Sequence, residues 1–314
     1  MITVPREFNP IKKGDDTIQI ESPSELCIYS LFKPDHEVTK TTINFFNTIA
    51  KLTLVDGVKV HIDFSKLERL TAAASVMIFA EISRAQLITE CSDVVSFTLP
   101  SSEESSKLFR TCGLYKAIMP GTHRKIIKLF EDDHAYQSGV DPNKFLISTL
   151  LHLHREGLEL TKPEVRVISK GIQEAMLNVQ HHAYINEQNP QSGIGKRWWH
   201  YVHCDTEKKR VNFIIYDKGA SIPKTIQNVM LGRHPDSEAI EHAFKKGITR
   251  LTGTTRGKGS QDIKEAAKIK DKSSLLVMSG KGILFIDNDK EDKIKDNLPC
   301  EVNGTLIEWS IPYE

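Results

Sequence analysis

The sequence predicts an α/β protein made of two domains, and three observations support this prediction. Strand-like and helix-like segments alternate over residues 17–113, strand patterns dominate residues 274–311, and a polar stretch separates the two halves. A chain of 314 residues is also longer than most single domains. We therefore expect an N-terminal domain over residues 1–125, a linker over 126–143 and a C-terminal domain over 144–314.

The composition is typical of a soluble globular protein. Apolar residues make up 39% of the chain and charged residues 26%, and the formal net charge of +1 argues against a chain that coats nucleic acid. We expect no signal peptide, no membrane span and a cytoplasmic location. The five cysteines form no CxxC pair, so we expect reduced structural thiols.

The first half contains a regular alternation of strand and helix patterns. Strand-forming residues occur at 17–32, 57–64 and 94–100, and helix patterns at 71–87 and 103–111. This order favours a small α/β domain with a largely parallel sheet.

The second half begins with helices and ends with strands. We predict helices at 144–154, 163–183 and 237–246, a buried strand at 211–216, and three strands in an antiparallel run at 274–278, 282–287 and 305–311.

The helix predicted at 163–183 carries a polar stripe within EAMLNVQHHAY. Glu174, Asn178 and His182 follow one another at intervals of four residues and lie on one side of the helix. An amide oxygen can help to hold Mg²⁺ beside phosphate oxygens, and a carboxylate can activate an attacking hydroxyl. The alternative is a solvated helix face with no function.

The strand that follows ends in the sequence IIYDKGASIP. Asp217 stands at the end of the apolar strand, and Gly219 allows a sharp turn directly after it. A carboxylate held at the floor of a pocket can accept a hydrogen bond from an adenine amino group. A simple strand end followed by a turn remains the other interpretation.

A glycine-rich segment, LTGTTRGKGSQDIKEAAKI, leads into a helix that begins near Ser260. Backbone N–H groups, hydroxyls and the positive end of a helix suit a polyphosphate. The segment is not a P-loop, because Lys258 is followed by glycine rather than by Ser or Thr.

In order and spacing these three motifs resemble the asparagine box and the two glycine boxes of the Bergerat-fold (GHKL) superfamily, and NGTLIEWSIP near the C-terminus resembles its glycine-threonine motif. The resemblance implies an α/β sandwich with helices on one face of a mixed sheet, and it implies ATP and Mg²⁺ as ligands. Glu174 would be the catalytic carboxylate and Asn178 the Mg²⁺ ligand, and residues 244–250 are similar to the family's lid. The nucleotide-binding candidates are Asn178, His182, Asp217, Gly219, Ile222, Thr255, Arg256, Gly257, Lys258, Gly259, Ser260 and Thr305.

One position departs from the family pattern. The second glycine box usually contains a third glycine where this chain has Gln261. The asparagine box is most similar to that of the anti-sigma-factor kinases. Three functions therefore stay open: an ATP-dependent regulatory switch with ATPase activity, a protein serine/threonine kinase that acts on a partner in trans, and a module that binds ATP without catalysis. The resemblance implies a regulatory protein partner and is compatible with a homodimer.

The first half resembles a STAS domain in the stretch VKVHIDFSKLERLTAAASVMIFAEI. The family's Asp-Ser-Ser-Gly positions read Thr71, Ala72, Ala73 and Ala74 here, so the usual phosphoacceptor serine is missing. The resemblance implies an interaction or regulatory module.

Two further clusters have simpler interpretations. The histidines 181, 182, 200 and 203 lack the spacing of a zinc site, and Trp198 and Trp199 suit a core or an interface better than base stacking.

Overall fold

The computed structural model describes residues 4–14, 16–29, 36–184, 194–226, 234–245, 259–288 and 293–313. These residues form two compact units. The N-terminal unit ends at Gln137 and also takes in residues 194–195, and the C-terminal unit begins at Ser138. Each unit is described below by itself.

The segment predicted as a linker, 126–143, has regular structure. It contains most of helix α5 (His123–Glu131) and the strand β7 (Tyr136–Gly139), in which the two units divide. Helix α5 buries Ile126 and Leu129, while its other residues are mostly charged. The segment therefore has the polar composition of a linker although it forms an amphipathic helix.

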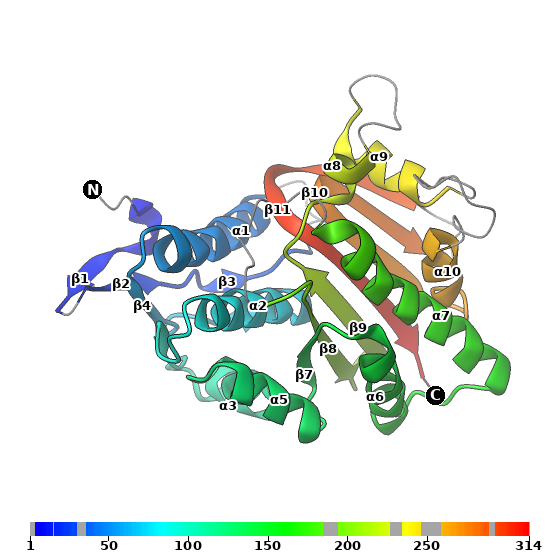
Figure 1. The fold of residues 1–314 in the computed structure, drawn as a ribbon, viewed down its shortest axis with the longest axis horizontal. Coiled ribbons are helices and arrows are strands. Elements are labelled where there is room, and N and C mark those ends of the chain that lie inside the picture. The colour runs from blue at the N-terminus through cyan, green and yellow to red at the C-terminus, as the bar shows by residue number, and fades with distance from the viewer. Residues whose placement is uncertain are drawn as a thin grey trace. The chain divides into compact units, whose positions relative to one another are not determined.

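The N-terminal unit contains a four-stranded sheet in the order β1-β2-β4-β6. Strands β1, β2 and β4 are labelled in Figure 1. Strands β2, β4 and β6 are parallel, as the alternating pattern predicts, and β1 adds an antiparallel edge. A second, two-stranded sheet pairs β3 with β5. The strands are β1 (Ile11–Lys13), β2 (Thr17–Glu21), β3 (Glu25–Leu26), β4 (Lys59–Asp63), β5 (Arg69–Leu70) and β6 (Val95–Thr98).

Helix α2 is almost completely buried in the N-terminal unit, which fits its apolar composition. Helix α1 has no counterpart in the sequence prediction. Its buried face includes Thr39 and Thr42, and the Thr42 hydroxyl accepts a hydrogen bond from the Cys27 N–H, so part of the buried stripe is polar. The helical segments are η1 (Arg6–Phe8), α1 (Glu37–Ala50) with the π-helical turn Lys51–Val55, α2 (Ala72–Ile88), α3 (Glu103–Thr111), α4 (Leu114–Ile118) and α5.

The C-terminal unit is built on a five-stranded sheet in the order β10-β11-β9-β8-β7. The pairs β10/β11, β11/β9 and β9/β8 are antiparallel. The strands predicted at 274–278 and 282–287 are one strand, because β10 continues through irregularities in its pairing at Ser279, Gly280 and Gly282. The strands are β8 (Trp198–Asp205), β9 (Arg210–Asp217), β10 (Ser274–Asp287) and β11 (Lys293–Pro312).

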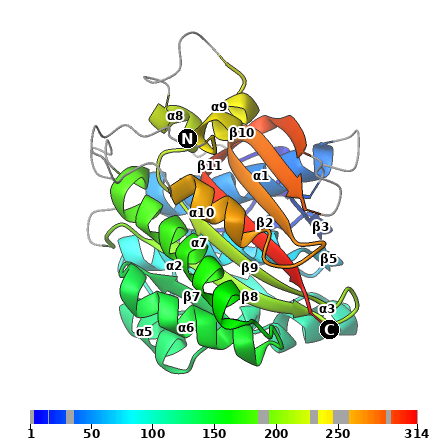
Figure 2. The ribbon, with the colours of Figure 1, turned by 90° about the vertical axis from the view of Figure 1, so that its right-hand side faces the viewer.

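Helices α6, α7 and α10 lie side by side on one face of this sheet (Figures 1 and 2). Helix α6 (Pro142–Arg155) begins with the Asp141 side chain accepting two backbone N–H groups, and α7 (Lys162–Asn178) begins with a capping box of Thr161 and Glu164. The π-helical turn Val179–Ala183 continues α7. The remaining helices are α8 (Ile222–Ile226), α9 (Asp236–Ala243) and α10 (Gly259–Ala266), of which α8 and α9 contact β10.

Large aromatic side chains fill the space between this sheet and its helices. The Phe213 ring stacks on Trp309 at 5.6 Å, and Phe145 of α6 meets Trp198 edge to face at 5.7 Å. The Trp309 indole N–H donates to the Ile263 carbonyl and so fixes α10 on β11. Trp198 and Trp199 are both fully buried, as expected for side chains in a core or an interface. In the described part of the chain, no helix has both the length and the apolar character required to cross a bilayer.

His200 on β8 makes this core sensitive to acid. Its ring lies between Phe145 and Phe213, and its Nδ1 has no hydrogen-bond partner among the described residues. Burial, together with the nearby His152, lowers the pKa of His200 to about 3. The folded state therefore holds a neutral imidazole, whereas the unfolded chain binds a proton as the pH falls below about 6.5. The contribution of the neutral His200 to the free energy of unfolding is therefore full above about pH 6.5 and is lost as the pH falls toward 3.

We predict that His200→Leu reduces the loss of stability in acid. Between pH 7 and pH 5 the variant should lose about 2 kcal/mol less of its free energy of unfolding than the parent protein. Urea unfolding at both pH values measures this difference. His154→Gln, at an exposed position on α6, is the control and should follow the parent protein. An equal acid dependence in all three proteins would contradict the prediction.

Candidate functional site

Four side chains form a row across the sheet of the C-terminal unit. Asp217 is the last residue of β9, and the strand register places Thr305 of β11 and Trp198 of β8 opposite it. Ser279 of β10 lies opposite Thr305. Residues directly opposite each other share one face of a sheet, so all four point to the same side. Because Trp198 contacts Phe145 of α6, this is the face that the helices cover.

The turn after β9 holds the Asp217 carboxylate in a fixed orientation. The Gly219 N–H donates to Asp217 Oδ1 at 2.8 Å, and the Ala220 N–H donates to the carbonyl of Ala183 at 2.5 Å. A Cβ atom on Gly219 would overlap that carbonyl. Glycine is therefore required for the end of the π-helical turn to pack on this turn, and Asp217 is held beside the end of α7.

Ser279 of β10 connects β11 to the first turn of α8. Its hydroxyl accepts from the Ile222 N–H at 2.8 Å, donates to the Gly304 carbonyl at 3.0 Å and lies 2.8 Å from the Thr305 hydroxyl. Sequence reasoning did not identify Ser279. The feature that could have drawn attention to it is a serine inside an otherwise apolar strand, directly before Gly280 and Gly282.

Glu174 and Asn178 lie one turn apart on α7, and both are half-buried. Neither side chain makes a hydrogen bond to the residues that the structure describes. Burial raises the pKa of Glu174, and the nearby Asp262 carboxylate raises it further. A carboxylate with a raised pKa accepts a proton more readily than one in water, which suits a general base.

Helix α10 packs closely on α7, and glycines permit the approach. A Cβ atom on Gly171 would lie 2.5 Å from the Ala266 Cβ, and one on Gly259 would overlap the Glu174 carboxyl group. Two residues that the sequence assigned to the site, Gly259 and Glu174, are therefore in contact. The first backbone N–H groups of a helix have no partner within it, so this end of α10 suits an anion.

The other candidates fall into two groups. His182, Ile222 and Ser260 are described, and each is partly exposed, on the π-helical turn, at the start of α8 and in the first turn of α10 respectively. Thr255, Arg256, Gly257 and Lys258 lie outside the described residues, as does part of the lid, 246–250.

Gln261, at the position where the resemblance leads us to expect a third glycine, lies in the first turn of α10. Its amide nitrogen donates to Glu265 Oε1 at 2.5 Å, one turn further along the helix. The side chain is thus bonded along α10 itself. This contact gives the substituted position a local role that glycine could not provide.

The residues present fit a polar ligand with an accompanying ion. Ser221 Oγ, in the turn between Gly219 and Ile222, is buried and has no hydrogen-bond partner among the described residues. Within the same part of the chain, no three His, Cys, Asp or Glu side chains gather closely enough to hold a metal ion. An ion beside Asn178 would therefore take further oxygens from the ligand and from water, as Mg²⁺ does when it binds together with phosphates.

No protein-family model and no curated protein matches this chain.

We predict that Ser279→Ala destabilises the C-terminal unit by about 1–3 kcal/mol, because it leaves the Ile222 N–H and the Gly304 carbonyl without their partner. Chemical unfolding measures the loss. Ser274→Ala is the matched control in the same strand. The Ser274 side chain is partly exposed and has no hydrogen bond within the described residues, so this change should stay within about 0.5 kcal/mol. Equal effects of the two substitutions would contradict the role of Ser279.

Proposed function

We propose that the C-terminal unit is a Bergerat-type domain that binds ATP with Mg²⁺ and hydrolyses it as a regulatory switch. The observation that carries this proposal is the row of Ser279, Thr305 and Asp217 in the same unit as Glu174 and Asn178, whose side chains make no hydrogen bond to the described residues. The hydrogen-bonded side chains of Asp217 and Thr305 can recognise a base, and the half-buried side chains of Glu174 and Asn178 can act on a phosphate.

The adenine end of the ligand would meet the row at the strand ends. Asp217 would accept a hydrogen bond from the adenine amino group, and the hydrogen bond from Gly219 supports this role because it fixes the carboxylate before the ligand arrives. Thr305, whose hydroxyl is held by Ser279, would supply a second polar contact. A preorganised site loses less entropy on binding.

The phosphate end would meet α7 and α10. The Asn178 amide oxygen would hold Mg²⁺ together with phosphate oxygens, and the first N–H groups of α10, at Gly259 and Ser260, would bind a phosphate. The magnesium ion would neutralise phosphate charge. The contact between Gly259 and Glu174 supports this arrangement because it brings the helix terminus and the carboxylate together.

Glu174 would act as the general base. Its raised pKa supports this role, as does the absence of a hydrogen-bond partner among the described residues, because such a carboxylate can accept a proton from water. The same group could accept a proton from the hydroxyl of a partner protein. Hydrolysis and phosphoryl transfer to a protein therefore differ in the acceptor and not in the base.

The N-terminal unit would serve as the regulatory, STAS-like module. The parallel strands β2 and β4, with α2 following β4, support this assignment. Helix α2 begins after Thr71, whose hydroxyl donates to the Leu26 carbonyl, and Ala73 and Ala74 are fully buried. These positions lack the family's phosphoacceptor serine, so the module would bind a partner rather than accept phosphate at this helix.

We predict that millimolar Mg-ATP raises the melting temperature of the protein and that Asp217→Asn lowers its affinity for ATP about tenfold or more, since the variant loses a charged hydrogen-bond acceptor. Titration calorimetry measures the affinity. Asp205→Asn changes an aspartate at the opposite end of the β8/β9 pair and should bind ATP as the parent protein does. Absence of any ATP-dependent shift in melting temperature would overturn the proposed function.

We predict that Glu174→Gln keeps ATP binding but lowers turnover about a hundredfold or more, as loss of a general base does. Turnover of the parent protein should rise with pH through a pKa above the ordinary value of glutamate. Release of labelled phosphate from γ-labelled ATP measures the reaction, and label on a second protein would identify a kinase instead. Unchanged turnover in Glu174→Gln would exclude Glu174 as the base.

A further inference from the structure

A small pocket in the C-terminal unit is lined by residues of α9 and α10 and by the part of β10 and β11 nearest the connection between these two strands. Its floor is apolar and includes Leu284 and Ile286 of β10. Its volume is about 20 Å³, which is room for a group the size of one or two phosphate oxygens and not for a nucleotide. None of the nucleotide-binding candidates lines it, although Phe244 and Lys245 belong to the segment that resembles a lid.

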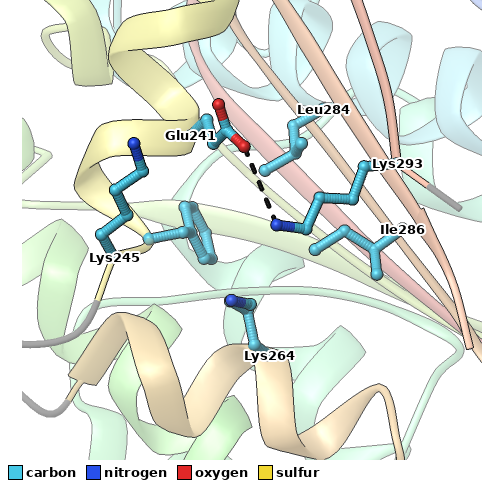
Figure 3. A pocket seen from close by; sticks show the side chains of 7 residues that line it. Glu241, Lys245, Lys264, Leu284, Ile286 and Lys293 are labelled. Carbon is cyan, nitrogen blue, oxygen red and sulfur yellow. Dashed lines mark ion pairs between the residues drawn. The ribbon is translucent and has the colours of Figure 1, made fainter. Parts of the chain in front are cut away.

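Positive groups from three elements surround this pocket. Lys264 comes from α10, Lys293 is the first residue of β11, and Lys245 follows α9. Figure 3 shows the amines of Lys264 on α10 and Lys293 on β11 directed into the same space. Lys293 stands directly opposite Ile286 in the hairpin, so its position over the apolar floor follows from the strand register.

Among the described residues that line the pocket, Glu241 is the one carboxylate, and it is already paired. Its oxygens lie 2.9 Å from the Lys295 amine and 3.7 Å from the Lys293 amine. The Lys295 hydrogen bond, together with the neighbouring lysines, lowers the pKa of Glu241. Lys264 has no ion-pair partner among the described residues. Burial lowers the pKa of Lys264, and the charges of Lys293 and Lys268 lower it further.

The lining therefore carries an excess of positive charge. Among the described lining residues, three lysines against one glutamate give a formal net charge of +2. An apolar floor strengthens charge interactions above it, because it lowers the local dielectric constant. A phosphate monoester carries about −1.5 to −2 charges at pH 7, whereas a carboxylate carries one. The phosphoryl group matches this excess.

We propose that the pocket formed by Lys264, Lys293 and Lys245 binds a phosphoryl dianion, either free phosphate or the phosphate of an ester. Lys264 and Lys293 donate to its oxygens, and Lys245 adds charge at the rim. This site is separate from the proposed ATP site and does not depend on it.

Titration of the full chain with inorganic phosphate at constant ionic strength, followed by ¹H–¹⁵N NMR, tests the proposal. Saturable shifts are expected for amides around Lys264 and Lys293. Lys264→Gln and Lys293→Gln should each weaken binding about tenfold, which is the value of one charge-assisted hydrogen bond. Lys170→Gln removes the same charge from an exposed site on α7 and should leave the affinity unchanged.

One further variant and the location of the shifts make the test specific. Glu241→Gln removes the competing carboxylate and should tighten phosphate binding several-fold, about the effect of one nearby charge. The largest shifts should centre on Lys264, Leu284 and Lys293 rather than on Gly259, which separates this pocket from the phosphate end of the ATP site. Tighter binding of phosphoserine than of inorganic phosphate would identify an ester as the ligand, and the reverse order would identify free phosphate. Equal weakening by Lys170→Gln and Lys264→Gln, or equal binding of acetate and phosphate, would overturn the proposal.

Discussion

The candidate site depends on the antiparallel register that places Asp217 of β9 opposite Thr305 of β11. A shift of one residue would turn the Asp217 carboxylate to the other face of the sheet. The register is secured by the stacked pair of Phe213 and Trp309 on the same face. Gly304 makes the close approach possible, because its φ of +97° and its missing Cβ let β11 pass the Asp217 carbonyl.

The second requirement is the packing of α10 on α7. Gly171 lets the two helices approach, and this contact determines where α10 begins relative to the side chains of α7. Glu174 is thereby half-buried, and this burial, together with the Asp262 carboxylate, raises its pKa. A polar group left in this state destabilises the fold, and proteins retain such groups mainly where they are used.

Local patterns predicted the elements whose side chains repeat clearly, and contacts between elements could not be predicted from them. The apolar run at 211–216 correctly predicted β9, and the helix predicted at 71–87 matches α2 to within one residue at each end. Helix α1 was missed because threonines share its buried face. The role of Ser279 and the contact between Gly259 and Glu174 arise from strand register and helix packing. No pattern along the chain encodes these directly.

A crystal structure of the protein with Mg²⁺ and a non-hydrolysable ATP analogue tests the central claim most directly. The proposed site predicts that the adenine amino group lies within hydrogen-bond distance of the Asp217 carboxylate, with the metal ion beside the Asn178 amide. A nucleotide bound away from Asp217, or no bound nucleotide at millimolar concentration, would contradict the assignment.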